Sequence, residues 1–131
     1  MAALEIFELM DVHRFLIGVV DDDPRVLESL EELLASAGYR ALLFLSAQAF
    51  LNANGFQQVD CLISDIGMPA ISGWELLEMS RTAYPDLPVL LITARDEEHM
   101  PVPVEGARRV FRKPFDGKEL LAALDTILER G

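Results

Sequence analysis

The chain has 131 residues, with 22 acidic against 11 basic side chains and a formal net charge of −11. This length fits one domain, and a hydrophobic content of 51% excludes a disordered acidic tail. The negative charge disfavours direct binding to nucleic acid or to an anionic membrane, because their phosphates would be repelled. Every apolar run is far shorter than the roughly 18 residues of a membrane span. The single cysteine, Cys61, excludes a disulfide within the chain, which favours a reducing cytoplasm.

Short apolar runs alternate with helical patterns along most of the chain. Pro24 and Gly38 bracket the first helical pattern, Asn54-Gly55 predicts a turn, and Asp116 followed by Glu119 is typical of a capping box before the last helix. The expected strands are 15–20, 40–45, 60–64, 88–93 and 109–111, and the expected helices are 26–37, 46–52, 76–84 and 116–128. Buried strands joined through helices predict a doubly wound α/β domain with a parallel sheet and helices on both faces.

Two segments depart from this alternation. Residues 1–14 form an N-terminal extension before the domain at 15–131, and Leu4 and Phe7 suggest a helix with one apolar stripe. Packing of that helix on the domain is favoured over a role in dimerisation, which stays open. The other segment is 96–106, where Pro101 and Pro103 predict an irregular fourth helix.

Polar side chains follow four of the expected strands. Asp21-Asp22-Asp23 follows the first, the third ends at Asp65, the fourth ends at Thr93, and Lys113-Pro114 follows the fifth. Each alone has a common structural explanation, such as a solvated acidic run, a helix cap or a surface charge. Because the carboxyl ends of parallel strands meet at one edge of the sheet, the residues are expected to lie together.

Phosphoryl transfer to a carboxylate is the chemistry that this set supports. Crowded carboxylates call for a hard divalent cation, and Mg²⁺ prefers a few carboxylates and several waters. Asp65 would be the nucleophile, Thr93 would donate a hydrogen bond to a phosphoryl oxygen, and Lys113 would pair first with Asp65 and then with the phosphoryl group.

Through these residues the sequence resembles the receiver domain of two-component response regulators, and in particular receivers of the nitrogen-fixation and nodulation type. The resemblance covers about residues 15–130. It rests on four motifs, Val19-Val20-Asp21-Asp22-Asp23-Pro24, Ser64-Asp65-Ile66-Gly67-Met68-Pro69 with Gly73, Ile92-Thr93-Ala94-Arg95, and Arg112-Lys113-Pro114-Phe115.

The resemblance implies a flavodoxin-like sheet of order 2-1-3-4-5 and phosphorylation of Asp65 by a histidine kinase or a histidine phosphotransfer protein. It implies that Asp22, Asp65 and the Gly67 carbonyl bind Mg²⁺ directly, with Asp21 acting through a metal-bound water. Thr93 and Lys113 match the switch hydroxyl and the family lysine, and the small Ala94 leaves room for phosphoryl oxygens to reach its backbone amide.

The departures from the family concern output rather than phosphorylation. Val110 stands where the family commonly has an aromatic switch residue, three positions before the lysine. Pro101 and Pro103 fall in the expected fourth helix and predict a remodelled signalling face. Gly67 and Arg95 occupy positions that influence the lifetime of the acyl phosphate in the family, in a direction that the sequence does not define.

Three hypotheses for function follow. The favoured one is a phosphoacceptor switch that catalyses only its own phosphorylation and dephosphorylation. A pseudo-receiver that binds proteins independently of phosphorylation is the alternative. A magnesium phosphohydrolase is disfavoured because no later acidic pair accompanies Asp21 and Asp23. The end of the sequence at Gly131 is compatible with a stand-alone receiver or with one segment of a longer regulator.

Overall fold

The computed structural model describes residues 15–94 and 105–128. The predictions for the N-terminal extension and for the segment with Pro101 and Pro103 lie outside these residues, except for the end of that segment at 105–106. Within the described part, no helix has the length and apolar character needed to cross a membrane.

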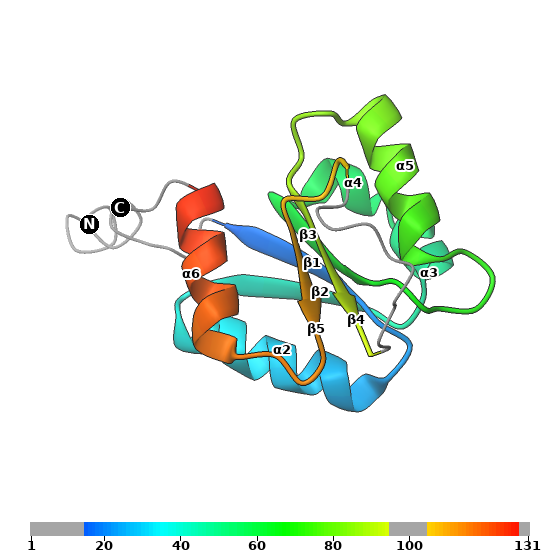
Figure 1. Ribbon diagram of the computed structural model, residues 1–131. Coiled ribbons are helices and arrows are strands. Elements are labelled where there is room, and N and C mark those ends of the chain that lie inside the picture. The colour runs from blue at the N-terminus through cyan, green and yellow to red at the C-terminus, as the bar shows by residue number, and fades with distance from the viewer. Residues whose placement is uncertain (1–14, 95–104, 129–131) are drawn as a thin grey trace, which may run out of the picture.

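Five parallel strands form one sheet in the order β2-β1-β3-β4-β5 (Figure 1). They are β1 (Leu16–Val20), β2 (Arg40–Phe44), β3 (Cys61–Asp65), β4 (Val89–Thr93) and β5 (Arg109–Arg112). This confirms the fold class and the strand order, with each strand within about one residue of its expected bounds. Because all strands run the same way, residues that follow them gather at one edge.

The helices cover both faces of the sheet. They are α2 (Pro24–Ser36), α3 (Ala47–Asn52), α4 (Gly55–Gln58), α5 (Gly73–Ala83) and α6 (Gly117–Ile127). In Figure 1, α2 and α6 lie on one side of the sheet and α3, α4 and α5 on the other.

The turn predicted at Asn54-Gly55 is confirmed, whereas the capping box predicted at Asp116 and Glu119 was wrong. Asn54 does adopt the left-handed conformation of a turn, but the short helix α4 follows it directly. Asp116 caps α6 by accepting a hydrogen bond from the Lys118 N–H, whereas the reciprocal capping box forms at Ser72 and Glu75, at the start of α5. Both Ser72/Glu75 and Asp116/Glu119 show the i, i+3 pattern of a capping box. The pattern alone does not tell which pair forms the box, because the Asp116 side chain caps α6 without Glu119.

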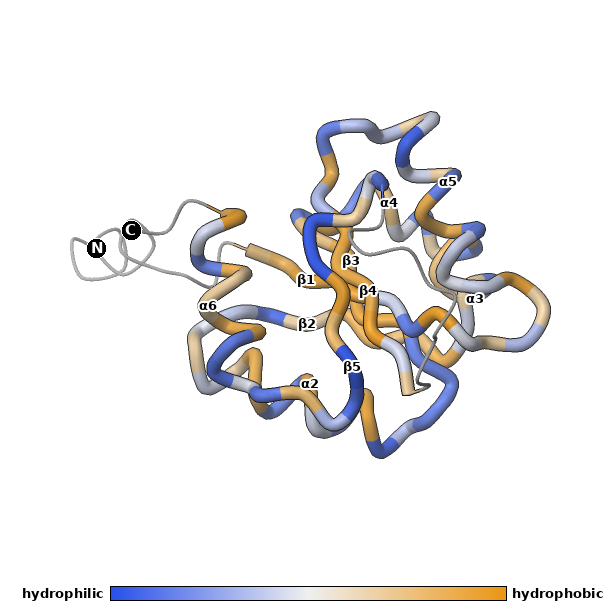
Figure 2. Tube along the Cα trace, viewed as in Figure 1, coloured by the Kyte–Doolittle hydropathy of each residue, from blue (hydrophilic) through white to orange (hydrophobic). Residues whose placement is uncertain are grey.

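Two hydrophobic clusters sandwich the sheet. One packs β-strand side chains such as Val19 and Ile63 against Leu30 of α2 and Leu124 of α6. The other packs strand side chains such as Leu62 and Leu91 against Leu76 and Leu77 of α5, together with residues of α3. Figure 2 shows the resulting pattern, with hydrophobic strands inside and hydrophilic stretches on the outer helices and loops. Cys61 is buried in the first cluster, and burial raises the pKa of its thiol to about 12, as expected for a structural cysteine.

Candidate functional site

At the carboxyl edge of the sheet, Asp21, which follows the first strand, forms an ion pair with Lys113, which follows the last strand. Lys113, directly after β5, donates from Nζ to Asp21 Oδ2 at 2.8 Å, and the same Nζ lies 3.7 Å from Asp65 Oδ1. Asp21 is 0% exposed and Asp65 6% exposed. One ammonium thus faces two buried carboxylates, which leaves negative charge uncompensated at this edge.

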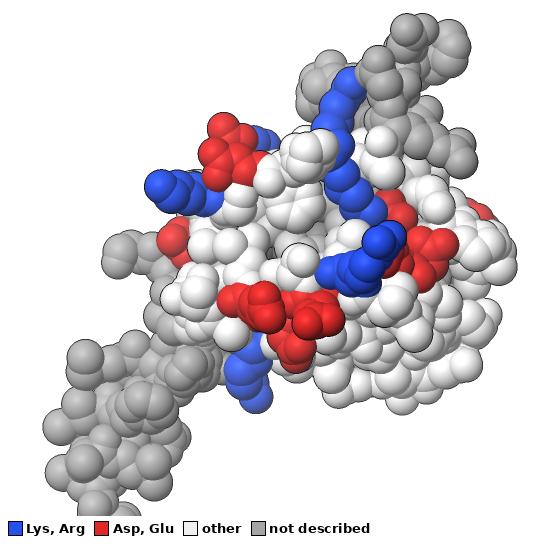
Figure 3. Space-filling model, turned by 90° about the horizontal axis from the view of Figure 1, so that it is seen from below, with Lys and Arg blue, Asp and Glu red and all other residues white. Residues whose placement is uncertain are grey.

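A third carboxylate completes the cluster on its open side. Asp21, Asp22 and Asp65 each offer one oxygen, and these oxygens all lie within 4.8 Å of one another. Asp22 is exposed, so the cluster opens toward solvent. Hard oxygen donors, excess negative charge and access for water together fit Mg²⁺, which keeps several of its waters in proteins. Figure 3 shows the molecule from below, the side toward which β4 and β5 run, with acidic and basic side chains close together.

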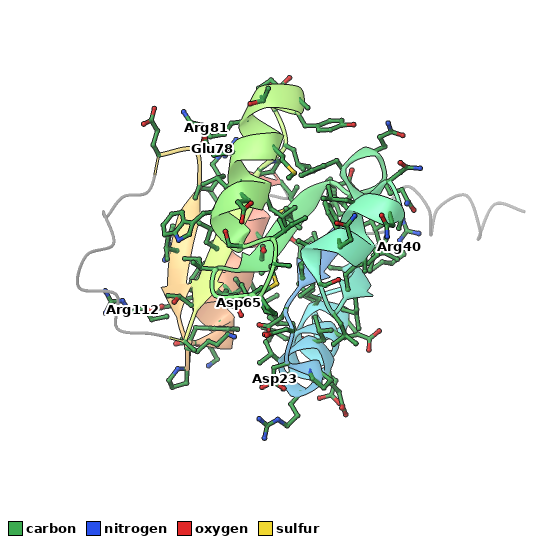
Figure 4. All side chains as sticks on the ribbon, turned by 90° about the vertical axis from the view of Figure 1, so that its right-hand side faces the viewer. Asp23, Arg40, Asp65, Glu78, Arg81 and Arg112 are labelled. Atoms are coloured by element: carbon green, nitrogen blue, oxygen red, sulfur yellow. The ribbon has the colours of Figure 1, made fainter. Side chains whose placement is uncertain are left out.

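Asp23 does not belong to this cluster, although it is third in the same acidic run. Its side chain caps α2 by accepting from the Arg25 N–H at 2.9 Å, and it pairs with the Arg25 guanidinium at 3.2 Å. Hydrogen bonds from Arg25 lower the pKa of the Asp23 carboxyl. Figure 4 places Asp23 at the start of α2, close to the end of the sheet where Asp65 lies. The run therefore divides into two site residues and one helix cap.

Burial and neighbouring charges shift the pKa of the Asp65 carboxyl. Burial, followed by the neighbouring Asp21 charge, raises its pKa above the ordinary value of 3.8, while the Lys113 ammonium and a hydrogen bond from the Gly67 backbone N–H act in the opposite direction. The Gly67 N–H contact was missed by the sequence analysis, which assigned only the carbonyl of this residue. A backbone contact of this kind leaves no side-chain signal in a sequence.

Gly73 sets how closely α5 approaches the end of β3. A Cβ at this position would lie 2.4 Å from the backbone oxygen of Asp65 and 2.8 Å from Ile66 Cα. The Gly73 N–H donates to the Ile66 carbonyl at 3.1 Å, which ties the start of α5 to the Asp65 loop. The absence of a side chain at Gly73 therefore positions the helix against Asp65.

β4 ends at Thr93 at the same edge, and Ala94 is the first residue after it. Asp65 pairs in register with Ile92, so Thr93 lies one residue further toward the site, and it is 2% exposed. The Thr93 carbonyl accepts from the Lys113 backbone N–H at 2.7 Å, which fixes the start of the loop carrying the lysine. Ala94 is exposed and follows directly. The Lys113–Pro114 peptide bond is cis.

Val110 lies on β5, three residues before Lys113 and half-buried. Its side chain packs against the hydrophobic cluster on the α5 side of the sheet, whereas the adjacent Phe111 points into the cluster on the α2 and α6 side. The aromatic residue of this strand thus faces away from the side on which the family's switch residue is expected. His13 and His99, the two histidines of the chain, lie outside the described residues.

This fold and this edge define the receiver class. The family profile described as the response regulator receiver domain matches residues 17–125, so the chain belongs to this family of two-component signal transduction.

Similar proteins and similar solved structures are also response regulators. The chain is 36% identical over 118 residues to the transcriptional regulatory protein FixJ of Bradyrhizobium diazoefficiens, covering 87% of this chain and 57% of the relative. It is 35% identical to the response regulator protein TodT of Pseudomonas putida, covering 86% of this chain and 51% of the relative. It thus spans about half the length of these relatives. The response regulator protein TrrA of Thermotoga maritima, solved in complex with Mg²⁺ and BeF, superposes with a TM-score of 0.78 at 29% identity, covering 86% of this chain and 98% of that one.

Proposed function

We propose that this chain accepts a phosphoryl group on Asp65 from a cytoplasmic histidine kinase or histidine phosphotransfer protein, in a Mg²⁺-dependent reaction, and thereby switches protein–protein contacts. One observation carries the proposal. Carboxylate oxygens of Asp21, Asp22 and Asp65 converge within 4.8 Å, beside an ammonium group 2.8 Å from Asp21. The solved structure of TrrA with Mg²⁺ and BeF supports it by similarity.

Asp65 is the nucleophile of this reaction. One of its oxygens bonds to phosphorus as the bond between phosphorus and the donor's imidazole nitrogen breaks, and the imidazole leaves with the electron pair. Asp22, Asp65 and the Gly67 carbonyl would hold Mg²⁺, with Asp21 acting through a water. The bound metal supplies charge neutralisation at the phosphoryl oxygens.

The other residues of the edge act on the phosphoryl group after transfer. The Lys113 ammonium, already 3.7 Å from Asp65 Oδ1, pairs with a phosphoryl oxygen once Asp65 is phosphorylated. The Thr93 hydroxyl donates to a second phosphoryl oxygen, and the Ala94 backbone N–H to a third. Movement of Thr93 toward the phosphoryl group then changes how the end of β4 packs against its neighbours.

Intact-mass spectrometry tests the nucleophile and the metal together. The protein is incubated with acetyl phosphate and Mg²⁺, beside Asp65→Asn, a chelator control, and Asp86→Asn as a matched change at an exposed turn residue. We expect one phosphoryl adduct in the wild type and in Asp86→Asn, and none in Asp65→Asn or with chelator. An undiminished adduct in Asp65→Asn would refute the assignment.

Val110 favours a second candidate, a protein-binding module that keeps the fold without the switch. Beryllium fluoride separates the two. A receiver binds it with Mg²⁺ and shifts the amide resonances of Thr93, Ala94 and Lys113. A protein that forms no adduct and shows no such shifts is the phosphorylation-independent module.

A further inference from the structure

A groove of about 520 Å³ lies between the start of β5 and one flank of α6, far from the phosphoacceptor edge. Arg108 and Arg109 form one wall, and the other wall is formed by residues of α6, namely Glu119, Ala122, Ala123, Thr126 and Ile127. Figure 1 shows the start of β5 and the last turn of α6 on the same side of the molecule. The groove thus combines two arginines on one wall with one carboxylate, Glu119, and mostly small or apolar side chains on the other, so its charged side chains sum to a positive charge.

The two arginines lack an acidic partner within residues 15–94 and 105–128. Both are exposed, and no carboxylate of that part of the chain forms an ion pair with either one. The Arg109 guanidinium instead lies over the Phe111 ring, 4.7 Å from its centroid. In a chain of net charge −11, two adjacent unpaired arginines mark a place that attracts an acidic segment.

The N-terminal segment of this chain has the complementary chemistry. Residues 1–14 carry Glu5, Glu8 and Asp11 at intervals of three, interleaved with apolar side chains that include Leu4 and Phe7. Their charges match the arginines, and their apolar side chains match the α6 wall. These residues lie outside the described part of the structure, so the argument uses only their sequence.

The point where the segment joins the domain is linked through Tyr39 to α6, the helix that forms one wall of the groove. The Phe15 ring is 6.5 Å from that of Tyr39, whose hydroxyl donates to Asp125 Oδ1 on α6 at 2.5 Å. Asp125 precedes the groove residues Thr126 and Ile127. Fourteen residues reach at most about 46–50 Å when extended, so the groove is within range. A short tether also gives an effective concentration of the order of millimolar.

We propose that residues 1–14 bind in cis to the groove between β5 and α6. Glu5, Glu8 and Asp11 pair there with Arg108 and Arg109, and the apolar side chains cover the flank of α6. The bound segment covers the outer edge of β5, so a partner of that edge must displace it. This inference does not depend on phosphorylation of Asp65.

Paramagnetic relaxation enhancement, measured on a protein of residues 1–131, tests the proposal. A nitroxide is attached through Ala3→Cys, while the buried Cys61 thiol, with its pKa raised to about 12, stays unlabelled. We expect the amide signals of Ala122, Thr126 and Ile127 to lose at least half their intensity in the labelled chain. The same resonances must keep their intensity when isotope-labelled wild type is mixed with spin-labelled chain, since binding is in cis.

Charge reversal separates the groove from nonspecific attraction. Arg109→Glu should release the segment, so that the amide signals regain most of their intensity. Adding Glu8→Arg to Arg109→Glu swaps the two charges, so the segment should bind again and the signals should again lose intensity. Arg25→Glu, the same charge change at the other end of the domain, should have no effect. Signal loss in the mixed sample, an equal response to Arg25→Glu, or no loss in the labelled chain would each overturn the proposal.

Discussion

The two ends of the sheet carry charge in opposite ways. At the carboxyl end, Asp21 is fully buried and depends on Lys113 for its counter-charge. At the amino end, Arg108 and Arg109 are exposed, and Arg81 pairs at the surface with Glu78 and Glu105. Figure 4 shows Arg81 and Glu78 on α5, well away from Asp65. A buried charge that loses its partner is costly, whereas water solvates an exposed one, so substitutions at the two ends should differ several-fold in effect.

Removing the lysine should have the largest effect. Lys113→Met leaves Asp21 buried without its ammonium partner, and we expect the unfolding free energy of the metal-free protein to fall by about 3 kcal/mol. Urea denaturation measures this, with the exposed Lys118→Met as the matched control, which should change little. Added Mg²⁺ should recover part of the loss in Lys113→Met. Equal effects of the two substitutions would contradict the contrast between buried and exposed charge.

Gly73→Ala should rank second. Its Cβ would lie 2.4 Å from the Asp65 carbonyl oxygen, so α5 must shift, at a cost of about 2 kcal/mol. Because the shift disturbs the loop after Asp65, labelling by acetyl phosphate should slow as well. Gly67→Ala is the control for stability, since a Cβ there meets nothing within 4 Å. A Gly73→Ala protein as stable as Gly67→Ala would show that the helix is not held this closely.

Asp65→Asn should change stability less than these two substitutions, and it should stabilise the metal-free protein rather than destabilise it. The pKa of Asp65 is raised in the folded state, so this state binds the proton more tightly than the unfolded chain. The unfolding free energy therefore falls as the pH rises from the unfolded value of 3.8 through the folded pKa. Asp65→Asn removes this loss, so the metal-free variant should be more stable than wild type at about pH 7, and the two should converge in acid. Urea midpoints across pH, with chelator present, measure the difference.

Arg81→Ala should have the smallest effect. Its ion pairs with Glu78 and Glu105 involve side chains that are 40%, 67% and 85% exposed, so the expected loss is about 0.5 kcal/mol and should shrink further at high salt. Thermal denaturation at low and high ionic strength tests this. A loss as large as that of Lys113→Met would remove the distinction between the two ends.

Much of this architecture follows from sequence because the alternation of strands and helices fixes which residues share an edge. Asp21, Asp22 and Lys113 come directly after strands, whereas Asp65 and Thr93 are the last residues of theirs, and the structure gathers all five at one edge. Their roles in phosphorylation remain proposals. Asp23 shows the limit of the pattern, because an acid after a strand is equally suited to bind a metal or to cap the next helix.

The remaining differences depend on packing in three dimensions. The helix α4 was not predicted after the Asn54-Gly55 turn, because a helix of one turn has too few residues for a periodic pattern. The close contact of Gly73 with the Asp65 carbonyl involves residues of two elements, so only their packing reveals it. Val110 was recognised from the sequence as a departure from the family. Phe111, the next residue, packs on the opposite face of the sheet from Val110, because neighbouring side chains alternate along β5.

The ion pair between Lys113 and Asp21 joins residues 92 positions apart in the chain. During synthesis, the first four strands leave the ribosome before Lys113 does, and Asp21 then has no ammonium group to accompany it into the interior. Its burial at that stage is unfavourable, so the nascent chain gains little from assembling the sheet early. The acidic site therefore gains its counter-charge only when β5 joins the sheet and brings Lys113 to Asp21.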